Sequence, residues 1–192
     1  MDKPKKVYEA REELRKDSAV LIEDIGEATA VIRGYIDKLK PYLWYFHLLY
    51  TQYKLTKPNL KAELTALNVL MKKNNVRPQT YEQKLMYAIL TLKQTDSSTG
   101  ALIKLTKMLK RNSVRFENEL KKERLTYSEL KWINTQLEKI YVMQEDGEGH
   151  AERLSNEYIE LIKNVQEEFP KEYALYTSVD ITIENPEEIT ID

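Results

Sequence analysis

The chain has 192 residues, a length that fits one domain or a main domain with a small appendage. Its 42% hydrophobic and 32% charged residues exclude a disordered chain and a membrane protein, and the absence of cysteine excludes disulfides, thiolate metal sites and cysteine nucleophiles. The formal net charge of −1 hides a strong asymmetry, because residues 54–124 carry a net charge of +10 and residues 125–192 carry −11.

The first expected element is a long helix over residues 4–40. Apolar or small residues recur there at alternating steps of four and three, a heptad pattern that predicts packing against neighbouring helices. These residues are Leu14, Ser18, Leu21, Ile25, Ala28, Ile32, Tyr35 and Leu39. Pro41 predicts the end of this helix, because proline lacks the N–H group of a helical hydrogen bond. Residues 42–50 are apolar nearly all the way round, so we expect them to be buried.

Five further helices are expected, over residues 60–74, 81–92, 101–124, 127–140 and 150–169. Thr80 with Gln83, and Thr126 with Glu129, have the spacing of a capping box, which marks a helix start. The polar segments 95–100 and 144–149 contain glycine and predict loops. The predicted fold class is therefore an all-α bundle of about six to seven helices, with a long N-terminal helix, within a domain of residues 1–170.

Residues 171–192 differ from the rest of the chain. Apolar and more polar residues alternate from Tyr173 to Ile183, a period of two that is typical of a strand. Because a single strand cannot form a sheet alone, we expect a short extended, β-like C-terminal arm. Val179, Ile181 and Ile183 would then dock on the sheet edge of a partner, lie over the bundle, or remain disordered.

The strongest candidate site is a stripe of cations on the helix expected over residues 101–124. They recur mostly at steps of three and four, which places them on one side of a helix: Lys104, Lys107, Lys110, Arg111, Arg115 and Lys122. A one-sided row of cations can follow the phosphates of a nucleic acid. The alternatives are a solvated helix face, or a face that pairs with the acidic C-terminal third of the same chain or of another copy.

An aromatic cluster is the second candidate. Trp44, Tyr45, Phe46, Tyr50 and Tyr53 favour the middle of a bundle over a partner surface or a base-stacking platform. His47 lies among them, and we expect it to be a buried histidine with one hydrogen bond.

An ion site is the third candidate. Asp146, Glu148, His150 and Glu152 are close in sequence, but their spacing matches neither a calcium loop nor a two-histidine zinc helix. We therefore predict no metal and no cofactor.

The function predicted from these features is that of a non-catalytic helical interaction or assembly protein. It would be a structural or regulatory subunit, for example of a virus, that uses complementary basic and acidic surfaces and its C-terminal arm to bind a protein partner or another copy. The alternative is a nucleic-acid-binding accessory protein that uses the helix around residues 104–124. Because the N-terminus is polar and no apolar run could span a bilayer, we expect a cytoplasmic protein without membrane contact.

Overall fold

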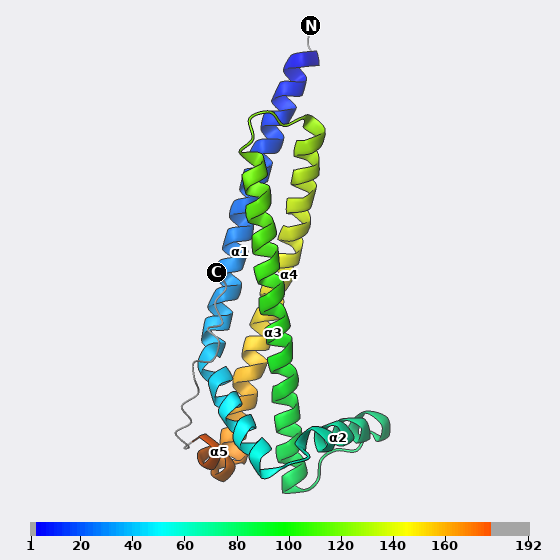
Figure 1. Ribbon diagram of the computed structural model, residues 1–192, viewed down its shortest axis with the longest axis vertical. Helices are drawn as coiled ribbons and strands as arrows, with labels where there is room; N and C mark the ends of the chain where they lie inside the picture. The colour runs from blue at the N-terminus through cyan, green and yellow to red at the C-terminus, as the bar shows by residue number, and fades with distance from the viewer. Residues whose placement is uncertain (1–2, 178–192) are drawn as a thin grey trace. The chain divides into compact units, whose positions relative to one another are not determined.

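The structure, a computed structural model, describes residues 3–177, which form five α-helices (Figure 1). They are α1 (Lys3–Thr56), α2 (Leu60–Asn74), α3 (Tyr81–Leu120), α4 (Tyr127–Glu168) and α5 (Pro170–Thr177). No strand occurs in this part of the chain. The all-α prediction is confirmed, whereas the expected six to seven helices are replaced by five, because three expected breaks lie inside longer helices.

The first of these breaks is Pro41, which lies inside α1. Leu39 before it and Leu43 after it are both almost fully buried. A proline in a helix interior costs about 3 kcal/mol, whereas each fully buried leucine contributes about 1.5–3 kcal/mol. Continuing the helix keeps the apolar residues on both sides of Pro41 in the core, which outweighs the lost hydrogen bond.

The second break, expected at residues 95–100, lies inside α3. Thr95 and Thr99 are buried, and their hydroxyls donate hydrogen bonds to the carbonyls of Thr91 and Thr95, at 3.0 and 2.9 Å. Ser98 bonds to the carbonyl four residues before it in the same way. These polar side chains are therefore satisfied by the helix itself and do not end it.

The third break, expected at residues 144–149, lies inside α4. Gln144 is buried, and its amide donates to the hydroxyl of Thr29 at 3.1 Å. Gly147 is also buried, and a Cβ atom at this position would lie 3.2 Å from Cδ1 of Ile32. Residues that resemble a turn in the sequence thus serve the close packing of α4 on α1.

The C-terminal prediction needs a correction as well. Residues 171–177 were expected in an extended arm but belong to α5, which begins with Pro170, a residue favoured in the first helical turn. The amide of Tyr173 donates to the carbonyl of Phe169 at 2.9 Å. The predicted docking residues lie outside the described residues: Val179, Ile181 and Ile183.

The chain divides into two compact units, each made of separate stretches of sequence. The first unit contains the described residues up to Tyr35 and Ala101–Glu152, and the second contains Ile36–Gly100 and the described residues from Arg153. The sequence predicts one bundle over residues 1–170 and gives no sign of this division.

The first unit is a three-helix bundle of α1, α3 and α4 (Figure 1). Its core confirms the predicted heptad pattern, because Ile25 and Ile32 are buried and Ile25 packs with residues of the other two helices. Two hydrogen bonds cross this core between side chains: the amide of Asn134 donates to Ser18 at 3.1 Å, and Gln144 bonds to Thr29 as above. The irregular position Ser18 in the heptad is thus a buried polar contact.

The second unit has a more aromatic core, formed by parts of α1, α3 and α4 together with α2 and α5. Phe46, Tyr53, Tyr158 and Phe169 are all buried there, among aliphatic residues such as Leu64 of α2.

The predicted start of α3 is confirmed, as its capping-box hydrogen bonds are formed. Among residues 3–177, none of the helices combines the length and the apolar character needed to cross a membrane.

Candidate functional site

The predicted cation stripe lies on the first unit, and five of its six residues lie on α3. We call Lys104, Lys107, Lys110, Arg111 and Arg115 the basic face. Lys104, Arg111 and Arg115 are exposed, and the two others are half-buried. The opposite side of the same helix enters the core through Leu102, Leu109 and Phe116. Because the helical rise is 1.5 Å per residue, the basic face extends over about 16 Å from its first to its last residue.

The sixth residue of the stripe, Lys122, does not lie on the helix. The expected helix end near Arg124 is wrong, because α3 ends at Leu120. Lys122 lies in the loop between α3 and α4, where its ammonium pairs with a carboxylate oxygen of Glu119 at 2.7 Å. It therefore lies beyond the C-terminal end of the basic face.

The basic face has no acidic partner within the described part of the chain. No carboxylate of residues 3–177 forms an ion pair with any of its five cations. On α3 itself, the nearest acidic residues are Asp96 on one side and Glu117 on the other. One predicted alternative was that the acidic C-terminal third covers this face. The described part of that third forms no ion pair with the basic face.

The loop beside the basic face is held by two arginines of α1. Arg15 donates to the carbonyls of Leu120 and Lys122, at 2.8 and 3.1 Å. Arg11 donates to the carbonyl of Leu125. The last carbonyls of a helix have no partner within the helix and carry partial negative charge, so guanidinium groups are suitable partners for them. These bonds fix the end of α3 and the path of the chain into α4.

The start of α4 is fixed by the predicted capping box. The carboxylate of Glu129 accepts a hydrogen bond from the amide of Thr126 at 2.7 Å, and the amide of Glu129 donates to the Thr126 hydroxyl at 3.2 Å. The hydrogen bonds with Thr126 hold the pKa of Glu129 below its ordinary value, and the charge of Lys122 adds to this effect. Glu129 is therefore an ionised capping residue.

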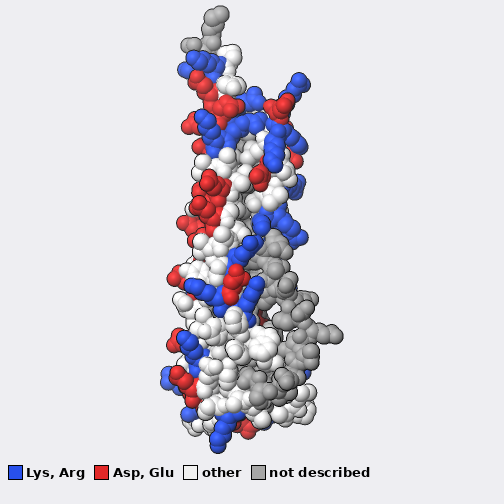
Figure 2. Space-filling view, turned by 90° about the vertical axis from the view of Figure 1, so that its left-hand side faces the viewer, with Lys and Arg blue, Asp and Glu red and all other residues white. Residues whose placement is uncertain are grey.

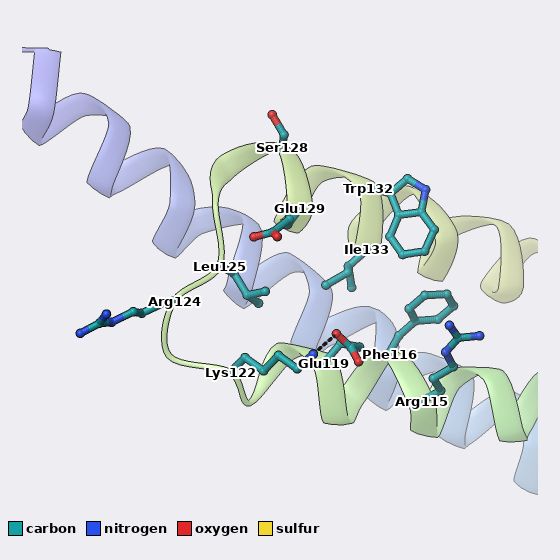
Figure 3. A pocket seen from close by; sticks show the side chains of 10 residues that line it. All are labelled: Arg115, Phe116, Glu119, Lys122, Arg124, Leu125, Ser128, Glu129, Trp132 and Ile133. Atoms are coloured by element: carbon teal, nitrogen blue, oxygen red, sulfur yellow. Dashed lines mark hydrogen bonds and ion pairs between the residues drawn. The ribbon is translucent and has the colours of Figure 1, made fainter.

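A pocket of about 470 Å³ opens between the end of α3 and the start of α4 (Figure 3). Its volume lies within the usual range for small-ligand sites. Ten residues line it: Arg115, Phe116, Glu119, Lys122, Arg124, Leu125, Ser128, Glu129, Trp132 and Ile133. Phe116, Leu125 and Ile133 are buried and form its apolar wall. The pocket is continuous with the basic face, because Arg115 belongs to both.

Trp132 is the large aromatic side chain at this pocket. It is 55% exposed, and its ring meets that of Phe116 edge-on, with 5.5 Å between the centroids and 72° between the planes. Figure 3 shows Arg115 beside Phe116, whereas Arg124 points away from both rings. Trp132 is not among the site residues predicted from the sequence. The available signal was its place outside the apolar stripe of α4, which runs through Leu130 and Ile133.

The first unit also carries acidic side chains on its two other helices, α1 and α4. We call Asp24, Glu27, Glu145 and Glu148 the acidic cluster, since all four act on Tyr141. The charge of Glu145 raises the pKa of Tyr141 most, followed by burial and the three other carboxylates. In the middle of the face shown in Figure 2, acidic side chains gather toward the left edge and basic side chains toward the right, whereas both kinds are mixed at the upper end.

The aromatic cluster predicted around residues 44–53 belongs to the second unit and is only partly core. Phe46 and Tyr53 are buried, Tyr50 is half-buried, and Trp44 and Tyr45 are 39% and 36% exposed. The prediction of a buried histidine is wrong. His47 is half-exposed because it lies at the edge of the core, where its Nε2 is 3.8 Å from a carboxylate oxygen of Asp96.

The four residues considered for an ion site lie on one helix, α4, and not around a turn. They are Asp146, Glu148, His150 and Glu152. Across the described residues, no three His, Cys, Asp or Glu side chains come close enough together to hold a metal ion.

Comparisons with known protein families, with curated proteins and with solved structures find no match to this chain. Any functional conclusion must therefore come from the chemistry of the basic face, the pocket and the acidic cluster.

Proposed function

We propose that this protein is a non-catalytic binding protein that holds a nucleic acid along the basic face of α3. One observation carries the proposal: five cations share one side of a helix, and no carboxylate of the described residues neutralises them. A row of unpaired cations gains binding free energy mainly from the release of counterions that are condensed on the phosphates. Without a bound anion, the like charges of these cations would repel one another, and no opposite charge would offset the repulsion.

The proposal predicts a steep dependence on salt. For a single strand, the logarithm of the association constant falls with the logarithm of salt concentration by about 0.7 for each phosphate that is neutralised. Five contacts give a slope of about −3.5, which corresponds to roughly a 100-fold loss of affinity between about 50 and 200 mM salt. For duplex DNA the slope for the same contacts is about −4.5.

The test is fluorescence anisotropy of labelled DNA and RNA with the full chain and two charge-reversal variants. The first variant carries Lys104→Glu, Lys107→Glu and Arg111→Glu, and should lose measurable binding at moderate salt. The control carries Lys61→Glu, Lys72→Glu and Lys73→Glu, three exposed lysines of α2 in the second unit. Because both variants change the net charge equally, the proposal requires that the control keep its affinity. Equal losses in both would show that net charge, and not the basic face, governs binding.

Self-association is the second candidate, and the acidic cluster favours it. A unit with a basic face on α3 and an acidic cluster on α1 and α4 can bind another copy of itself in a heterologous arrangement. Sedimentation velocity at low and high salt tests this candidate, which predicts assemblies that dissociate as salt rises. Neutralising Glu145 and Glu148 to Gln should then dissociate the assembly without weakening any binding of nucleic acid.

A further inference from the structure

Trp132 adds a second kind of contact to the end of the basic face. Its indole ring is more than half exposed, yet the edge-on contact with the buried ring of Phe116 supports it from one side. An aromatic ring held in this way offers its exposed face to a ligand. Binding then avoids the entropic cost of ordering a mobile side chain. The pocket beside it has room for a planar group.

Hydrogen bonds hold the two segments that form the pocket walls. Arg11 and Arg15 hold the loop carbonyls, and the capping box of Thr126 and Glu129 fixes the first turn of α4. Trp132 lies in the next turn of this helix. The ring is thus positioned from both helices before any ligand binds.

The charges at the pocket favour an anionic ligand although two carboxylates line it. Glu119 is paired with Lys122 at 2.7 Å, and Glu129 is engaged by the amide of Thr126. Arg115 has no carboxylate partner among the described residues, and it lies beside Phe116 at the pocket wall. The last cation of the basic face, Arg115, therefore lines the same pocket as the exposed ring of Trp132.

We infer that the α3–α4 pocket is a stacking site for an unpaired base of a single-stranded nucleic acid whose phosphates follow the basic face. This inference rests on the proposed function and narrows it to single strands. In a duplex the bases are already stacked and paired, so they cannot lie against an indole ring, whereas every base of a single strand offers a free face. Because stacking tolerates all bases, the site discriminates strandedness and not sequence.

Tryptophan fluorescence tests the inference directly, since the chain has only two tryptophans. In the Trp44→Phe variant of the full chain, Trp132 is the sole reporter. We expect its emission to be quenched by an oligothymidylate and by an oligouridylate of about 15 nucleotides, near the upper end of known single-strand site sizes. Inorganic polyphosphate, which has charge but no bases, should bind along the basic face without quenching. Equal quenching by polyphosphate would overturn the inference.

The matched substitutions are Trp132→Leu and Trp44→Leu. Stacking losses on removal of an aromatic ring correspond to about a 5- to 150-fold loss of affinity, so Trp132→Leu should weaken single-strand binding within this range. The salt slope and the affinity for duplex and polyphosphate should stay the same, and Trp132→Phe should recover most of the loss. Trp44→Leu, in the second unit, should change none of these values.

The outcomes separate the two proposals. Full single-strand affinity in Trp132→Leu, with the salt slope intact, would overturn the stacking site and leave the nucleic-acid function standing. Absence of binding to any strand at low salt would overturn both. Polyglutamate that binds as tightly as oligothymidylate and quenches Trp132 equally would replace both with an acidic protein partner.

Discussion

The cores of the two units differ in the polar contacts that join their helices. In the first unit, the buried side chains of Ser18 and Asn134 meet across the core, as do Thr29 and Gln144. In the second unit, the hydroxyl of Tyr158 is fully buried and has no hydrogen-bond partner among the described residues. Burial raises the pKa of Tyr158, and the charge of Asp96 adds to the shift.

This difference indicates that different interactions fix the packing of the helices in the two units. Paired polar groups inside an apolar core fix the register of helices, because any other register leaves them without partners. The first unit has such pairs and also holds the basic face and the pocket, whose geometry depends on how α3 and α4 lie against α1. The second unit relies on aromatic and aliphatic packing, and it bears the cost of an unsatisfied hydroxyl.

The largest expected effect comes from breaking a polar pair in the first unit. Asn134→Leu removes the donor to Ser18 and should lower the free energy of unfolding by about 1–3 kcal/mol, the cost of a buried polar group left without its partner. Adding Ser18→Ala should recover most of this loss, because both polar groups are then gone. Urea unfolding of the two single variants and the double variant measures the coupling.

The second polar pair provides the control for this experiment. Thr29 also donates to the carbonyl of Ile25 at 2.8 Å, so it keeps one partner when Gln144 is replaced. Gln144→Leu should therefore cost less than Asn134→Leu. Equal costs would mean that lost packing, and not the unpaired hydroxyl, dominates at both positions.

A smaller effect of opposite sign is expected in the second unit. Tyr158→Phe removes a buried hydroxyl that forms no hydrogen bond with any described residue, so it should raise the free energy of unfolding by about 1 kcal/mol. Tyr87→Phe, at an exposed position of the same unit, should change stability by less than about 0.5 kcal/mol. Thermal unfolding of both variants distinguishes these values, and a loss of stability in Tyr158→Phe would show that its hydroxyl is satisfied.

Local signals in the sequence predicted the helical class, the heptad core of α1 and both capping boxes, because each depends on residues three or four positions apart. The breaks at Pro41, at residues 95–100 and at residues 144–149 were wrong for a common reason. Propensity weakens a helix locally at these places, but burial of Leu43, Thr99 and Gly147 against distant residues decides the outcome.

The cations of the basic face could be read from helical spacing, whereas the pocket could not. Its shape depends on the bonds from Arg11 and Arg15 to a loop more than 100 residues away, and on the meeting of Phe116 with Trp132. No periodicity within one helix encodes such contacts. The division into two units is likewise a property of long-range packing.

The smallest expected effect compares the two capping boxes, which share one geometry but differ in one ionisable group. Gln83 accepts from the amide of Thr80 at 3.4 Å in the second unit, and Glu129 accepts from Thr126 at 2.7 Å in the first. Since the pKa of Glu129 is lowered in the folded state, its contribution is present above the ordinary glutamate pKa and is lost as pH falls through the folded value.

Exchanging the two side chains tests this argument. Glu129→Gln should remove part of the acid sensitivity of thermal unfolding that develops as pH falls below the ordinary glutamate pKa, because a glutamate of lowered pKa is protonated there. Gln83→Glu should add a comparable acid sensitivity, because the same amide and hydroxyl are there to bind a carboxylate. If both variants followed the wild-type pH profile, the cap would act through its hydrogen bonds alone and the charge of Glu129 would contribute nothing to the start of α4.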